Sequence, residues 1–339
     1  MKTVLVAASY SWPVYAPAFA DALEKNGLNV YRFAFDPYLR TPFARLQLWL
    51  GVGPHIARLN SDLRAFIQKT VPDICLVWTG LGVWPSTVRY LKRLCWATSY
   101  TNDDPFGPRG QLPFWRSFRK SIPIYDSHHV YRDINVSEYL SVGAKNVGIM
   151  RSYYVPWLHF PKNPLSPESS ENTITFIGHG EPDRLKVISV LADAGLKVKV
   201  YGPSQTWTGG DFNGNISYYP GTLEPDEYRS VIHQSGILLG FLSRQNRDNY
   251  TRRYFEVPAC GGFLLAERTS LVQQLYDEDQ EMVLFSAPGE ALEKCKYYLA
   301  NIGRRKQITD SSLKRCRRSK YDLLSRSQQW LNDLIALQK

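Results

Sequence analysis

The chain has 339 residues, of which 44% are hydrophobic and 21% charged, and 41 lysines and arginines against 31 acidic residues give a net charge of +10. This composition excludes a disordered chain, and the length exceeds what one hydrophobic core usually serves, so we expect two domains. No apolar run is long enough to predict a membrane-spanning helix. The five cysteines form no CxxC pair. They therefore predict neither a disulfide framework nor a zinc site, and they favour a reduced, cytoplasmic protein.

The first third of the chain predicts alternating strands and helices. An apolar strand over 3–8, a helix over 17–26 that ends at Gly27, and a strand over 28–35 form a βαβ unit, which implies a parallel sheet. The pattern continues with a helix over 60–69, a strand over 73–78, a helix over 85–94, a strand over 95–101, and weaker signals over 128–135 and 147–150.

A proline-, serine- and charge-rich stretch over 161–172 predicts a linker. The alternation then restarts, with strands over 173–177, 196–201, 236–242 and 262–266 and helices over 183–194 and 311–337. We therefore expect an α/β protein with two Rossmann-like parallel-sheet domains that face each other across a cleft. The predicted domains cover 1–160 and 173–310, and the helix over 311–339 is expected to pack back across both.

The stretch 247–267 carries the strongest chemical signal. Asp248 or Asn249 is the predicted N-cap of a short helix over 251–259, which Gly261 and Gly262 would end. The N–H groups near Thr251 and the positive end of that helix predict an anion site.

Two arginines and one glutamate lie on this predicted helix. Arg252 and Arg253, in its first turn, can donate to phosphate oxygens, and Glu256 can accept hydrogen bonds from sugar hydroxyls. The alternative is that Arg253 and Glu256 only form an i,i+3 ion pair on a surface helix.

The same residues carry a resemblance to a known family. The stretch 253–269 (RYFEVPACGGFLLAERT) resembles the signature of the CgeB-like group, relatives of a spore maturation protein within the GT-B glycosyltransferases. The stretch 175–184 (TFIGHGEPDR) fits the start of the C-terminal domain in that group, and 72–80 and 102–105 fit its N-terminal half more loosely.

The resemblance implies a GT-B fold with the nucleotide-sugar donor bound mainly by the C-terminal domain and the acceptor by the N-terminal domain. It also implies that positive side chains, and no bound metal, stabilise the leaving diphosphate. Many such enzymes contact the donor through two glutamates separated by seven residues. Glu256 matches the second, whereas the first position holds Asp248, whose side chain is one methylene shorter.

The turn after the strand over 173–177 is a second candidate for donor binding. Gly178 and Gly180 allow close approach of the backbone to phosphates, and His179 or Arg184 would contribute side-chain contacts. The alternative is an ordinary turn between a strand and a helix.

Three residues are candidates for a general base in the N-terminal half. Asp103 and Asp104 follow a predicted strand, and His128 precedes a second histidine. Self-capping of the Asn-Asp-Asp-Pro turn and a structural role for the histidines are the alternatives. Asp103-Asp104 is not the Asp-x-Asp pattern of manganese-dependent transferases, so we expect no metal and no cofactor.

Our leading hypothesis is a cytoplasmic glycosyltransferase of glycan biosynthesis that moves a sugar from a nucleoside-diphosphate donor to a hydroxyl of a glycan or related acceptor. We expect Glu256→Ala to weaken nucleotide binding and to leave the fold intact. The alternatives are a nucleotide-sugar epimerase, a phosphorylase, or a non-catalytic polyanion-binding protein. No motif predicts a specific nucleic-acid partner. The basic run over 304–320 indicates either a solvated helix face or peripheral contact with the inner membrane face.

Overall fold

The computed structural model describes residues 2–162, 172–207 and 214–338, which form two compact units. The first unit contains residues 1–151, 245–247 and 323–339, and the second contains 152–244 and 248–322. Residues 163–171 of the predicted linker lie outside the described residues. No helix in the described ranges combines the length and hydrophobicity that a bilayer-spanning segment needs.

The first unit is built on a six-stranded parallel sheet in the order β2-β1-β3-β4-β5-β6. Its strands are β1 (Thr3–Ala8), β2 (Asn29–Ala34), β3 (Ile74–Trp78), β4 (Trp96–Thr101), β5 (Ser127–Val130) and β6 (Val147–Ile149). Its helices are α1 (Ala16–Lys25), α2 (Pro42–Leu50), α3 (Pro54–Thr70), α4 (Pro85–Lys92), α5 (Arg116–Ser121), α6 (Asp133–Ser141) and α13 (Leu323–Leu337). Every residue of β3 is buried, as expected for a central parallel strand covered on both faces.

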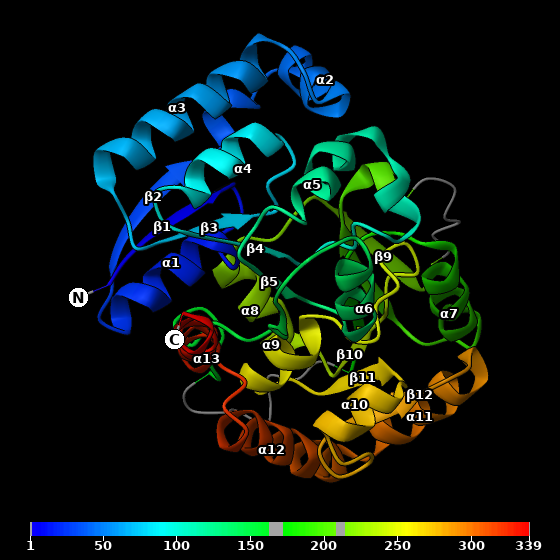
Figure 1. The fold of residues 1–339 in the computed structure, drawn as a ribbon. Coiled ribbons are helices and arrows are strands. Elements are labelled where there is room, and N and C mark those ends of the chain that lie inside the picture. The colour runs from blue at the N-terminus through cyan, green and yellow to red at the C-terminus, as the bar shows by residue number, and fades with distance from the viewer. Residues whose placement is uncertain (1, 163–171, 208–213, 339) are drawn as a thin grey trace. The chain divides into compact units, whose positions relative to one another are not determined.

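The second unit has a six-stranded parallel sheet in the order β12-β11-β10-β7-β8-β9. Its strands are β7 (Ile174–Ile177), β8 (Val198–Gly202), β9 (Ile216–Pro220), β10 (Ile237–Gly240), β11 (Leu264–Glu267) and β12 (Val283–Phe285). Its helices are α7 (Pro182–Asp193), α8 (Pro225–Gln234), α9 (Arg253–Ala259), α10 (Ser270–Leu275), α11 (Pro288–Ala300) and α12 (Ile302–Arg318). Figure 1 shows helices flanking each sheet. Both sheets are of the predicted Rossmann-like kind.

The segment before the predicted linker packs with the second unit. Tyr154 forms a β-bridge with Asp322, and the backbone N–H of Ser152 donates to the hydroxyl of Tyr250 at 3.3 Å. The division by contacts therefore falls after Arg151, whereas the composition had placed the end of the first domain at 160. Composition cannot reveal this difference, because it depends on which core the side chains enter.

The predicted helix over 311–337 is in fact two helices. Lys320 adopts a left-handed φ of 53° between α12 and α13, which interrupts the helical backbone. Helix α13 belongs to the first unit and packs on α1 (Figure 1), where the ring centroids of Trp330 and Phe19 lie 5.4 Å apart. Helix α12 begins at Ile302 and belongs to the second unit.

Candidate functional site

In the second sheet, the order in which the chain adds strands reverses between β7 and β10. The chain order runs outward from β7 to β9 on one side and from β10 to β12 on the other. Ligands of such folds bind beyond the carboxyl ends of the strands at this switch point. The loops that leave it are 178–181, after β7, and 241–252, after β10. These loops contain most of the residues that the sequence predicts for donor binding.

The glycines after β7 allow close packing against residues 206 and 207, which follow β8. Trp207 Nε1 donates to the carbonyl of Gly178 at 2.9 Å, and Gly180 N donates to Thr206 Oγ1 at 3.0 Å. A Cβ added to Gly180 would lie 2.1 Å from the Thr206 carbonyl oxygen. Internal packing therefore already requires glycine at position 180, whether or not a phosphate approaches. His179, between the two glycines, is exposed.

Arg184 holds the two loops together. Its guanidinium donates to the carbonyl oxygens of His179 at 2.8 Å and Leu242 at 2.9 Å, and it pairs with Glu181 at 2.7 Å. The side chain is buried, and burial lowers its pKa. Arg184 thus positions the loops of the switch point through its two Nη atoms, and its buried Nε has no hydrogen-bond partner among the described residues.

Helix α9 is anchored to the ends of the neighbouring strands. The hydroxyl of Tyr254 donates to the carbonyl oxygens of Gly240 and Glu267, each at 3.3 Å. Thr269 Oγ1 donates to the carbonyl of Asn249 at 2.7 Å. The helix starts at Arg253 with Arg252 as its N-cap residue, so the prediction of Asp248 or Asn249 as N-cap was wrong. A bond from Asp248 N to the Ser243 carbonyl keeps residue 248 in the loop.

Beside the paired Arg252 and Glu256, this loop and helix contain three other residues with a buried polar atom that lacks a hydrogen-bond partner within the described residues: Asn249 (Oδ1), Thr251 (Oγ1) and Arg253 (Nε). The Arg253 guanidinium lies 6.0 Å from the ring of Phe176, and one of its Nη atoms is 3.4 Å from the place of a Cβ on Gly178. Arg253 forms no ion pair among the residues described. Buried polar groups are normally satisfied, so these atoms indicate that a polar ligand binds here. The Arg253 guanidinium suits an anionic group of that ligand, whereas Asn249 Oδ1 can only accept and needs a donor such as a hydroxyl.

Glu256 is 1% exposed and is surrounded by protein groups. Its carboxylate accepts from Tyr228 Oη at 2.9 Å and pairs with Arg252 Nε at 2.6 Å. His159 Nε2 lies 3.6 Å away, and burial lowers the pKa of His159 to about 4 although Glu256 raises it. The helix therefore contains an i,i+4 pair with Arg252 and not the i,i+3 pair with Arg253. His159 and Tyr228 carry no local sequence signal, because only the tertiary fold brings them to Glu256.

The three candidate bases in the first unit differ in accessibility. Asp104 is 0% exposed, and it accepts from Arg247 at 2.6 and 2.9 Å, from Asn135 and from the N–H of Phe106. Burial raises the pKa of Asp104, but these hydrogen bonds outweigh it and hold the pKa below its usual range. Asp103 is half-buried and accepts from Asn246 at 3.5 Å.

His128 is fully buried in β5, with Nδ1 2.6 Å from Ser99 Oγ and Nε2 2.8 Å from the Ile122 carbonyl. Burial lowers its pKa to about 4. The structure thus gives Asp104 and His128 fixed internal partners, and it leaves Asp103 as the more accessible of the three.

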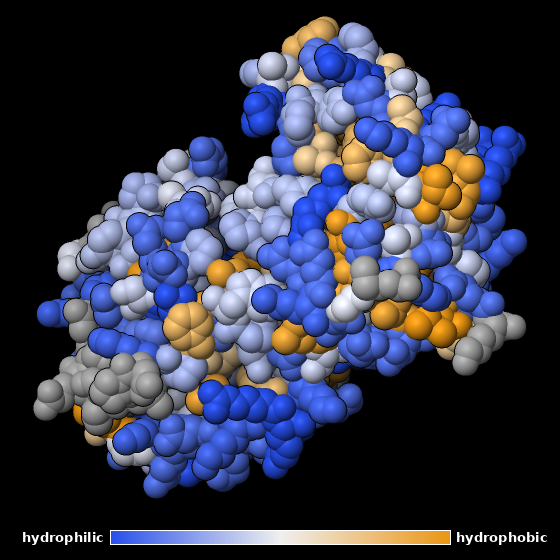
Figure 2. Space-filling model, turned by 90° about the vertical axis from the view of Figure 1, so that its left-hand side faces the viewer, coloured by the Kyte–Doolittle hydropathy of each residue, from blue (hydrophilic) through white to orange (hydrophobic). Residues whose placement is uncertain are grey.

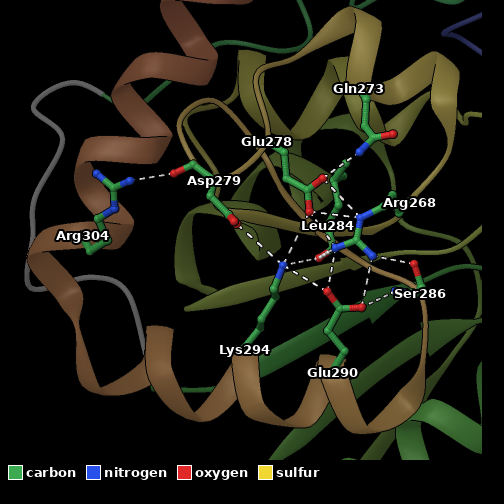
Figure 3. A network of polar contacts seen from close by, with 9 residues as sticks. All are labelled: Arg268, Gln273, Glu278, Asp279, Leu284, Ser286, Glu290, Lys294 and Arg304. Atoms are coloured by element: carbon green, nitrogen blue, oxygen red, sulfur yellow. Dashed lines mark hydrogen bonds and ion pairs between the residues drawn. The ribbon is translucent and has the colours of Figure 1, made fainter.

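The end of the 253–269 stretch enters a network of charged residues. Arg268 pairs with Glu278 and Glu290, each at 2.6 Å, and Lys294 lies 3.3 Å from Glu290 (Figure 3). The hydrogen bond from Arg268 contributes most to lowering the pKa of Glu290 to about 2. This network ties β11, the segment before β12, and α11 together, so Arg268 has a structural role in this unit.

Comparisons with known proteins bear on the fold of this chain and on its relation to a family. Residues 184–332 match a family model described as glycosyl transferase-like. No curated protein matches the sequence. A sucrose-phosphate synthase from Thermosynechococcus elongatus superimposes with a TM-score of 0.73 at 10% identity, over 99% of this chain and 100% of that chain. HepE from Anabaena, solved with UDP and glucose, superimposes with a TM-score of 0.66 at 11% identity, over 99% of this chain and 100% of that chain.

A trehalose 6-phosphate synthase from Burkholderia multivorans gives a TM-score of 0.64 at 13% identity, over 99% of this chain and 98% of that chain. The chain has the GT-B fold. Its two six-stranded parallel sheets are the two Rossmann-like domains of that fold, as the sequence predicted. The narrower resemblance to the CgeB-like group stays a prediction.

Proposed function

We propose that this protein is a glycosyltransferase that moves a sugar from a nucleoside-diphosphate donor to a hydroxyl of a glycan or related acceptor, without a metal ion. The observation that carries the proposal is the set of buried polar atoms at Asn249, Thr251 and Arg253 that lack a hydrogen-bond partner among the described residues. Arg253 lies beside the turn at Gly178. The match of residues 184–332 to a glycosyl transferase-like model and the GT-B fold support it.

In this proposal Arg253 stabilises the negative charge that develops on the departing diphosphate. A guanidinium that has no acidic partner in the described part of the chain is available for phosphate oxygens, and its position beside Phe176 and Gly178 limits its movement. An electrostatic contact of this kind is typically worth about 3 kcal/mol of activation barrier.

Glu256 would bind the ribose hydroxyls of the donor. Because Glu256 is 1% exposed beneath Arg252 and Tyr228, a hydroxyl can reach the carboxylate only after one of these side chains moves. We propose that the side chain of Arg252, which is 25% exposed, leaves Glu256 for the diphosphate when the donor binds. Asp103, the more accessible of the two aspartates, is the proposed base for the acceptor hydroxyl.

Calorimetry with UDP, GDP, dTDP, ADP and CMP tests donor binding, beginning with UDP because HepE was solved with that nucleotide. We expect Arg253→Ala to weaken binding of the selected nucleotide and to lower turnover by about a hundredfold. Arg318→Ala, on the 68% exposed Arg318 of the same unit, is the matched control and should change neither. Turnover that a chelator does not change would support the metal-independent mechanism. Undiminished activity of Arg253→Ala would remove Arg253 from the site, and no affinity for any nucleotide would refute the proposal.

A further inference from the structure

Helix α2 and the residue two positions beyond it expose an unusual concentration of apolar side chains. Exposed apolar residues are scattered over most of the described surface, as the separate orange areas in Figure 2 illustrate for one face. Five of them, however, fall within ten consecutive positions, and each is at least 45% exposed: Phe43, Leu46, Trp49, Leu50 and Val52. Phe43, Leu46 and Leu50 follow i, i+3, i+7 spacing, so they lie along one side of the helix.

The orientation of α2 is fixed by contacts on its other side. Gln47 is 4% exposed, and its Oε1 accepts from the N–H of His55 at 2.9 Å. Gly51 ends the helix with a φ of 75°, and its carbonyl accepts from Trp84 Nε1 at 2.9 Å. The helix thus buries Gln47 together with Ala44 and presents two leucines and two aromatic rings to solvent, which is unusual for a surface helix.

The surroundings of this apolar face are positively charged. The stretch 37–61 contains three arginines and lies between Asp36 and Asp62. Arg58 pairs with Asp62 at 3.5 Å, whereas Arg40 and Arg45 are exposed. Helix α5 lies next to α2, because Ser117 Oγ is 3.4 Å from the place of a Cβ on Gly51. The stretch 105–125, which includes α5, lacks acidic residues and exposes Arg116 and Lys120.

We propose that α2 docks this protein on an anionic lipid surface. A helix in the plane of the interface inserts an apolar face, its tryptophan prefers the headgroup level, and neighbouring arginines attract acidic lipids. The basic C-terminal run over 304–320 lacks such an apolar face, because α12, which contains most of this run, buries Ile308 and Cys316. The proposal does not depend on the donor chemistry.

Co-sedimentation of the full chain with vesicles tests this surface. We expect binding to phosphatidylcholine vesicles that contain about 30% phosphatidylglycerol, and much weaker binding to pure phosphatidylcholine or at about 0.5 M salt. The double variant Leu46→Glu/Trp49→Glu should bind at least about tenfold more weakly. Arg45→Gln should bind about fivefold more weakly and show a smaller dependence on salt.

Tyr297→Glu/Ile302→Glu is the matched control, because both side chains are 53% exposed but lie in the second unit. It should bind like the wild type. Trp49→Ala shortens one exposed side chain without adding charge, so it checks the result if the double glutamate variant unfolds. The proposal fails if the wild type does not bind anionic vesicles or if the double variant binds equally well. It also fails if the wild type is a dimer and the double variant is a monomer while neither protein binds lipid, because the face would then be a dimer interface.

Discussion

Replacing Glu256 separates its structural role from the proposed role in donor binding. Its carboxylate is 1% exposed and pairs with Arg252 at 2.6 Å and Tyr228 at 2.9 Å. Removing one partner of a buried pair costs about 3–5 kcal/mol. Because the Arg252 side chain is 25% exposed and can be partly hydrated, we expect the lower end, about 3 kcal/mol, for Glu256→Ala. The unpaired Tyr228 hydroxyl adds about 1 kcal/mol.

Urea unfolding of the nucleotide-free protein, followed by tryptophan fluorescence and far-UV circular dichroism, measures this change. Glu256→Gln keeps the shape but replaces one acceptor oxygen with an amide NH2, so it can accept from only one of Arg252 and Tyr228. We expect a loss of about 1–2 kcal/mol and a folded protein whose nucleotide affinity can be compared. Glu293→Ala, at a glutamate that is 74% exposed, should lie within about 0.5 kcal/mol of the wild type. If Glu256→Ala were as stable as Glu293→Ala, the carboxylate would not hold Arg252 and Tyr228 as we infer.

Two further changes test the packing of the units. His128 and His159 have pKa values of about 4 in the fold, against about 6.5 when unfolded, so the unfolded chain binds more protons between these values. The contribution of these histidines to the free energy of unfolding is complete above pH 6.5 and falls as the pH drops toward 4, by about 2 kcal/mol per histidine at pH 5. An equal free energy of unfolding at pH 7 and pH 5 would contradict this. Gly180→Ala would place a Cβ 2.1 Å from the Thr206 carbonyl oxygen, and we expect a loss of about 1–3 kcal/mol in thermal unfolding. Gly289→Ala, where nothing lies within 4 Å, should cost nothing, and equal stability of the two variants would rule out the close contact.

The sequence alone determined the class of fold and the order of most elements. Strand β3 is recognisable because a short apolar run bounded by polar residues suits a strand buried on both faces. Gly27 follows the end of α1 and takes a left-handed φ of 84°. The predicted helix end therefore has a physical cause, because glycine adopts this conformation without steric cost. Local spacing also placed the loops at 178–180 and 247–252 after strands, where parallel sheets bind ligands.

Only the tertiary structure decided which polar groups meet and which face of a helix is exposed. The partners of Glu256 include His159, almost a hundred residues earlier, and those of Asp104 include Arg247, 143 residues later. No helix was predicted from the sequence over 42–50, and the buried Gln47 and exposed Trp49 of α2 depend on how the helix packs against its neighbours. Local sequence sets backbone preferences within a few residues, whereas burial and hydrogen-bond partners depend on segments that only the folded chain brings together.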